Sequence, residues 1–205
     1  MTSTTIRRAL LVSTDDEPMN DIESDLQAAG YEVLRCHPSH ASGFPCGVLT
    51  EAGCPLDGVP VDVTVDVRQH PWPHPTLREQ GVTCSVRAGV PVVVLGRELH
   101  PFVPWATITT QSREHLTARC DDAIRESLVP LHDAAAHAVR QVLARLADGQ
   151  PFVVEVDRRE GDLRVRIIAE LASVVAGMAA TRAVAAIRAL DAHAGHIDVE
   201  VVAPT

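Results

Sequence analysis

Residues 8–35 decide the fold, and they read RALLVSTDDEPMNDIESDLQAAGYEVLR. This stretch opens with an apolar run at 8–12 and closes with a second β-rich run at 31–35. Between the two runs, Ile22, Leu26 and Ala29 recur at helical spacing, and Gly30 supplies a helix stop. The stretch therefore predicts a strand, a helix and a second strand parallel to the first.

Three further β-rich runs follow, at 61–67, 90–95 and 105–109. Strands that alternate with helical segments are typical of a parallel sheet covered by helices, so we predict an α/β domain over residues 1–127. Residues 36–60 are rich in Cys, Pro and Gly, and we expect them to form a loop-rich insertion.

The rest of the chain has a different pattern. A helix is predicted from Ser112 to about Ser127, and Pro130 suits the first turn of a separate second helix. Two alternating runs at 152–156 and 163–167 predict an antiparallel hairpin. An alanine-rich helix over 173–194 and a last strand at 197–201 complete the order α-β-β-α-β, which we assign to a small α+β domain over 128–205.

Composition excludes several classes of chemistry. The net charge is −9, and all 18 basic residues are Arg, so no lysine is available for a Schiff base, a phosphate-binding P-loop or a general base. An acidic chain is a poor partner for nucleic acid. Five Cys without a secretory leader predict a cytoplasmic protein with reduced thiols. None of the uninterrupted apolar runs is long enough to predict a membrane span.

Acidic residues follow two of the predicted strands. Asp15 and Asp16 come after the first strand, and Asp66 lies near the end of the third. The carboxyl ends of parallel strands line one crevice, so these three carboxylates could converge on a divalent cation such as Mg²⁺. The same acids before a helix could also simply complement the free N–H groups and dipole of its N-terminus.

These residues resemble the receiver domain of two-component response regulators. The resemblance covers roughly the first 110 residues through the run Asp15-Asp-Glu-Pro18, the following helix, and Val63-Thr-Val-Asp-Val-Arg68. It implies a flavodoxin-like sheet, Mg²⁺ held by Asp15 and Asp16, and a phosphoryl group accepted by Asp66. The fourth strand ends in Leu95-Gly96 without the family's Ser or Thr, and the family's Lys is missing. We therefore expect a degenerate receiver that is not phosphorylated.

Cysteines gather in and near the insertion. Cys36, Cys46, Cys54 and Cys84 offer the ligand set of an iron–sulfur cluster or a zinc ion. Their spacing contains no compact Cys-x-x-Cys pair, and an ordinary crossover helix after the second strand would put two Cys at each end of the sheet. All four can meet only if 36–60 is an irregular excursion. The alternatives are a redox-active pair of thiols and plain buried cysteines.

The run His70-Pro-Trp-Pro-His-Pro75 follows Asp66. Its alternating prolines predict a stiff, extended loop that presents His70, Trp72 and His74. The loop could bind a ligand or partner, with a histidine as base or metal ligand, or it could be a rigid surface segment.

The second domain resembles small KH-like or alkaline-shock-protein-like modules in the order of its elements, although no Gly-x-x-Gly clamp is present. One face of its sheet should carry mixed charge, with no aromatic residues for stacking bases. A sheet this small has edges to cover, so we expect it to dock on the first domain or on a second copy in a homodimer.

Three functions remain open. The first is a non-catalytic regulatory or scaffold protein with a pseudo-receiver domain, acting in signalling through protein–protein interaction. The second is an iron–sulfur or zinc redox or sensor protein that uses Cys36, Cys46, Cys54 and Cys84. The third is an enzyme that uses the acidic corner with Mg²⁺ and either His70 or His74.

Overall fold

A computed structural model describes residues 6–14, 19–37, 43–49, 53–96, 99–159, 161–192 and 194–204. The chain divides into two compact units, Met1–Ser127 and Leu128–Thr205. Each unit is described by itself below.

The first unit is built on five parallel strands. They are β1 (Arg7–Ser13), β2 (Tyr31–Arg35), β3 (Val63–Val67), β4 (Val92–Leu95) and β5 (Ile108–Thr110). Their order across the sheet is β2-β1-β3-β4-β5, and every neighbouring pair is parallel. This is the flavodoxin-like order, so the predicted α/β fold with a parallel sheet is confirmed.

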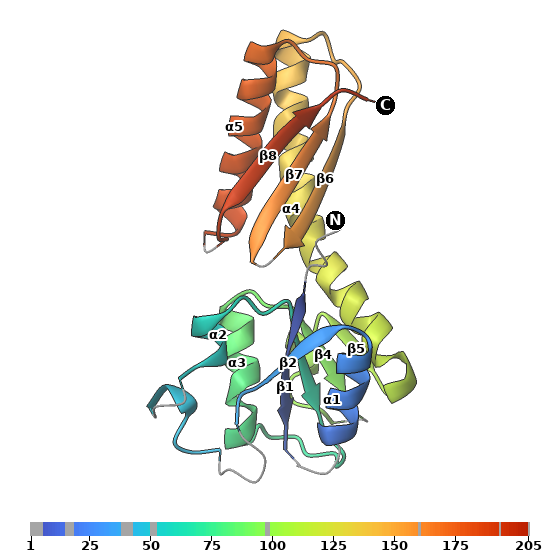
Figure 1. Cartoon of the computed structure of the whole chain (residues 1–205), viewed down its shortest axis with the longest axis vertical. Coiled ribbons are helices and arrows are strands. Elements are labelled where there is room, and N and C mark those ends of the chain that lie inside the picture. Colours follow the sequence, from blue (N-terminus) through green and yellow to red (C-terminus); the bar gives the residue numbers. More distant parts are fainter. Residues whose placement is uncertain are drawn as a thin grey trace. The chain divides into compact units, whose positions relative to one another are not determined.

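Helices cover both faces of this sheet (Figure 1). One face packs on α1 (Met19–Ala28) and the beginning of α4 (Leu116–Leu146), around a core that includes Leu11, Leu26 and Leu116. The other face packs on α2 (Pro55–Gly58) and α3 (Gln80–Arg87). Single 3-10 turns complete the unit at η1 (Gly47–Leu49), η2 (Leu77–Glu79), η3 (Val103–Trp105) and η4 (Arg113–His115).

The alternation of side chains along the strands fixes which residues face which helices. On β1, Ala9 and Leu11 point to the α1 side, whereas Leu10 and Val12 point to the α3 side. On β3 the valines belong to the α1 side, so Thr64 and Asp66 take the α3 side, where the Thr64 hydroxyl bonds the Ser85 hydroxyl at 2.7 Å. All five residues of β3 are buried.

The second unit is a three-stranded mixed sheet covered by two helices. Strands β6 (Val153–Arg159) and β7 (Asp162–Ile168) are antiparallel, and β8 (Ile197–Val202) lies parallel to β7 in the order β6-β7-β8. The core is formed by the end of α4, by α5 (Ser173–Leu190) and by inward residues such as Leu163 and Ile167.

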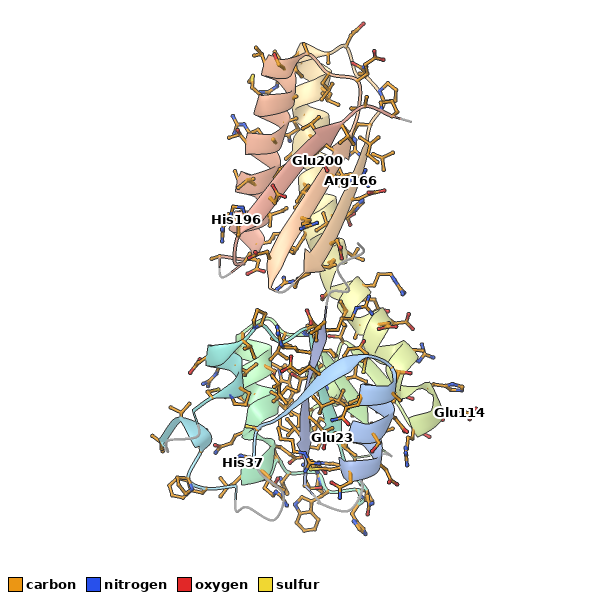
Figure 2. The ribbon with its side chains drawn as sticks, in the orientation of Figure 1. Glu23, His37, Glu114, Arg166, His196 and Glu200 are labelled. Carbon is orange, nitrogen blue, oxygen red and sulfur yellow. The ribbon has the colours of Figure 1, made fainter. Side chains whose placement is uncertain are left out.

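The other face of this sheet is charged, as the strand alternation predicts. Figure 2 shows Arg166 and Glu200 on this face. Arg166 lies 3.0 Å from Glu155 and 3.7 Å from Glu200, so it bridges strands on both sides of it. Arg166 therefore links β7 to both β6 and β8 through cross-strand ion pairs.

Two helix boundaries differ from the prediction. Instead of two helices separated near Pro130, α4 is one helix of 31 residues with Pro130 inside it. Apolar residues on both sides of the proline stay in helical phase, and their burial outweighs the one hydrogen bond that proline cannot donate. The alanine-rich helix ends at Leu190 rather than Ala194, because the Arg188 guanidinium binds the carbonyls of Ala194 and Gly195 and turns the chain back.

Among the described residues, α5 is the one helix that is long and apolar enough to cross a membrane by length and composition. Core helices of water-soluble proteins pass the same test. Within its own unit, α5 buries Ala179, Ala183 and Ile187 against the sheet, and it carries Arg182 and Arg188.

The interior proline makes α4 a target for a stability test. We expect Pro130→Ala to raise the free energy of unfolding by about 1–3 kcal/mol, because alanine restores a backbone donor and removes the steric conflict with the preceding turn. Urea unfolding followed by circular dichroism measures the difference. The exposed neighbour gives a control, Val129→Ala, which should change stability by less than about 0.5 kcal/mol. Unchanged or lower stability of Pro130→Ala would contradict an uninterrupted helix at this point.

Candidate functional site

The excursion between β2 and β3 carries three of the four candidate cysteines. Cys36 directly follows β2, Cys46 precedes η1, and Cys54 is the N-cap residue of α2. The fourth, Cys84, lies on α3. Among its described residues, the excursion contains only η1 and the four-residue α2 in place of a full crossover helix.

Close backbone contacts bring these cysteine-bearing turns together. Gly81 lies three residues before Cys84 on α3, and a Cβ at Gly81 would be 3.1 Å from the Cys36 sulfur. A Cβ at Gly47 would be 2.6 Å from the Gly53 carbonyl oxygen, a distance no side chain tolerates. The residue after Cys46 therefore touches the residue before Cys54, while α3 touches Cys36.

The pKa shifts of Cys36 and Cys84 also indicate that the four thiols lie near one another. Burial raises the pKa of Cys36 to about 11, and the thiols of Cys46, Cys54 and Cys84 raise it as well, against a backbone hydrogen bond from Gly81 that lowers it. Burial also raises the pKa of Cys84, followed by the effects of Cys54 and Cys46. The four cysteines lie on one side of the sheet, and the arrangement with two at each end does not occur.

The sulfurs are near one another without being packed around a single point. Within the described part of the chain, only Asp66, Glu79 and His100 form a group of three or more His, Cys, Asp or Glu ligand atoms within 4.8 Å of one another. No three of the four cysteine sulfurs come that close. Cys84 is exposed and the other three are half-buried, whereas Cys120 is buried against the opposite face of the sheet.

Asp66 occupies a closed interior position rather than an open acidic corner. Its side chain is 0% exposed, and its Oδ2 lies 3.4 Å from Nε2 of the equally buried His100. The predicted partners Asp15 and Asp16 lie outside the described residues. A phosphoryl acceptor must be reached by its donor, so the burial of Asp66 fits the expectation that this residue is not phosphorylated.

A buried ion pair stands beside Asp66. The Arg68 guanidinium binds both carboxylate oxygens of Glu79, and both side chains are almost fully buried. Arg68 also donates to the carbonyl of Trp72 and, at 2.9 Å, to that of His74. Glu79 accepts further hydrogen bonds from the N–H of Thr76 at 2.7 Å and from its hydroxyl at 2.9 Å. One cation thus holds the loop 70–75 against the unit.

The loop itself points its side chains outward. His70, Trp72 and His74 are all exposed, so the described structure does not bring these histidines to Asp66. The residues that do surround Asp66 were missed from the sequence. Thr76-x-x-Glu79 has the pattern of a capping box, which was the one local signal for Glu79.

The hydrogen bond that His100 accepts from Phe102 fixes which ring nitrogen faces Asp66. The N–H of Phe102 donates to Nδ1 of His100 at 3.3 Å, so Nε2 carries the proton of the neutral ring and faces Asp66. Burial, followed by the Arg68 charge, lowers the pKa of His100 to about 4. Burial, followed by the Glu79 charge, raises the pKa of Asp66 well above its usual value. Arg68 already occupies both carboxylate oxygens of Glu79, so we assign no metal to Asp66, Glu79 and His100.

No family model matches this chain, and no curated protein matches it. The flavodoxin-like sheet does not choose among functions, because that architecture carries many activities. Function is therefore inferred from the cysteines and the buried cluster.

The buried acid predicts a pH-dependent stability. Because the folded-state pKa of Asp66 is raised, its ionisation opposes folding, and the native protein loses stability as the pH rises above the unfolded pKa of about 4. Asp66→Asn cannot ionise. Its stability relative to the native protein should therefore increase from pH 4 to pH 8 in urea unfolding measurements. The exposed Asp198→Asn serves as control and should show no such trend, and the same flat difference for Asp66→Asn would refute a raised pKa.

Proposed function

We propose that this chain binds an iron–sulfur cluster through Cys36, Cys46, Cys54 and Cys84, and that it works as a redox or sensor protein on a receiver-like scaffold. The observation that carries the proposal is the convergence of four cysteines from three separate turns and a helix. Buried cysteines that serve only as small apolar residues have no reason to collect their thiols in one place. Four thiolates are a full ligand set for a cluster.

No three of the four sulfurs lie as close together as a single zinc ion would hold them. Thiolates bound tetrahedrally to one zinc at about 2.3 Å lie about 3.8 Å from one another. No three of these four sulfurs lie within 4.8 Å of one another. A polynuclear cluster has its irons between the ligands, so it holds the cysteine sulfurs further apart than one ion does.

The surroundings of the thiols also favour an iron–sulfur cluster. A backbone N–H of Gly81 points to Cys36, and such hydrogen bonds to sulfur stabilise reduced clusters and set their potential. Neighbouring thiols raise the pKa of Cys36 and of Cys84, because negative charges repel one another, and bound iron would remove that repulsion. Since Cys84 is exposed, one edge of the cluster would be open to an electron carrier or an oxidant.

A regulatory or scaffold role without a cofactor is the second candidate. Its support is the enclosed Asp66 in a chain without lysine, which leaves a receiver-like unit without its phosphorylation chemistry. Such a unit would act by binding a protein partner or a second copy. The two candidates differ in whether the four cysteines are needed for anything beyond folding.

The deciding experiment is elemental and spectroscopic. Protein purified without oxygen and without chelators should be brown and contain about four irons and four sulfides per chain, with the electron paramagnetic resonance signal of a reduced cluster after dithionite. Substituting Ser for Cys36, Cys46, Cys54 or Cys84 should abolish or sharply reduce the iron content. Cys120→Ala, a matched change on the far face, should retain it. Stoichiometric zinc, or a colourless folded protein without iron, would overturn the proposal.

A substitution at Gly47 tests the cluster site without removing any of the four cysteines that would bind the cluster. Gly47→Ala adds a methyl group 2.6 Å from the Gly53 carbonyl and should separate the turns that carry Cys46 and Cys54. We expect iron content at least fivefold lower and release to a chelator at least tenfold faster. Gly58→Ala is the control, because a Cβ there meets nothing within 4 Å. Equal iron retention in both variants would show that the close approach of these turns is not needed for the cluster.

A further inference from the structure

The segment 76–81 is held from two sides. On one side it touches the cysteine excursion, and on the other it is tied to Arg68 through Glu79. We propose that the four-cysteine centre controls the order of the exposed loop 70–75 through the buried Arg68–Glu79 pair, so that losing the cluster releases the loop that presents Trp72. This inference rests on the proposed function.

The first contact joins the segment to the cysteine excursion. Gly81 lies against Cys36, where a Cβ would be 3.1 Å from its sulfur. Gly43 lies against the backbone of η2, where a Cβ would be 2.5 Å from the nitrogen of Arg78 and 2.6 Å from the carbonyl carbon of Leu77. A cluster that binds Cys36 and Cys84 would tie the end of β2 to α3, and would press the excursion onto this segment.

The second contact joins the segment to the loop. Glu79 is enclosed by Arg68 and by the N–H and hydroxyl groups of Thr76. The same guanidinium donates to the carbonyls of Trp72 and His74. Arg68 therefore binds the loop and η2 at once, and a displacement of Glu79 would weaken the hold of Arg68 on the loop.

A buried ion pair suits this role because it has two distinct states. With both partners enclosed, the pair is rigid, and a displacement that admits water weakens it strongly. Movement of α3 after loss of the cluster would shift Glu79, which immediately precedes that helix. The loop would then lose two of the hydrogen bonds that hold its backbone.

The released surface has the chemistry of a protein-binding site. Trp72 is 59% exposed and stands between Pro71 and Pro73, so its indole is offered on a short, stiff segment. Tryptophan is among the residues that contribute most to protein–protein binding. Ordering of this loop by the cluster would thus change a surface that a protein partner can recognise.

Hydrogen–deuterium exchange of the full chain, read by mass spectrometry, tests the link. Cluster-loaded protein is compared with protein stripped by an oxidant and a chelator, and iron is measured on each sample. We expect amides in 70–80 to exchange at least tenfold faster after stripping, while strands β1 and β3 and the second unit keep their rates. Exchange that is unchanged in 70–80, or faster throughout the first unit, would overturn the inference.

The double variant Arg68→Gln with Glu79→Gln removes both charges together, so no single buried charge is left behind. In cluster-loaded protein this variant should keep its iron but show the fast exchange of 70–75 that the native chain shows only after stripping. Slow exchange of the loop in this variant would show that the ion pair is not the link. If the iron measurement shows that the native chain binds no cluster, both this inference and the proposed function are overturned. If the native chain binds iron but the exchange rate of 70–75 does not change on stripping, this inference alone is overturned.

Discussion

The enclosure of β3 is the constraint on which the first unit depends. This strand lies between β1 and β4, and all five of its residues are buried, including Asp66. A carboxyl group at such a position cannot be hydrated, so burial raises its pKa and favours the neutral form. His100 faces it with a protonated nitrogen, and Glu79 is neutralised by Arg68. The surroundings of Asp66 are therefore filled by the protein's own side chains.

The cation beside Asp66 and Glu79 is an arginine, and the chain contains no lysine. An arginine keeps its charge in an apolar environment where a lysine would lose its proton. Its planar head also offers donors in several directions. Arg68 uses them to bind a carboxylate and two backbone carbonyls at the same time. A single compact ammonium group does not have the reach to make this set of contacts.

Sequence reasoning succeeded where the signal was local and periodic. The β-rich run at 31–35 coincides with β2, and the helical spacing of Ile22 and Leu26 predicted the buried face of α1. It failed at Pro130, where a local rule was overridden by apolar residues that pack in two different cores.

The residues of the candidate site were likewise only partly predictable from the sequence. Cys36, Cys46, Cys54 and Cys84 could be identified as a set, but their spacing allowed two arrangements, and only the path of the excursion distinguishes them. Arg68, Glu79 and His100 are far apart in sequence and become one cluster only through the packing of α3 and the turn after β4. Thr76-x-x-Glu79 indicated a helix start but not a buried ion pair.

The continuity of α4 bears on where the chain can be cut. Ala123 belongs to the core of the first unit and Leu128 to that of the second, so a single helix supplies side chains to both. A cut between them would expose the hydrogen-bonding groups of a helix interior in each fragment. A truncated chain would therefore need to keep several turns of α4 beyond its nominal boundary.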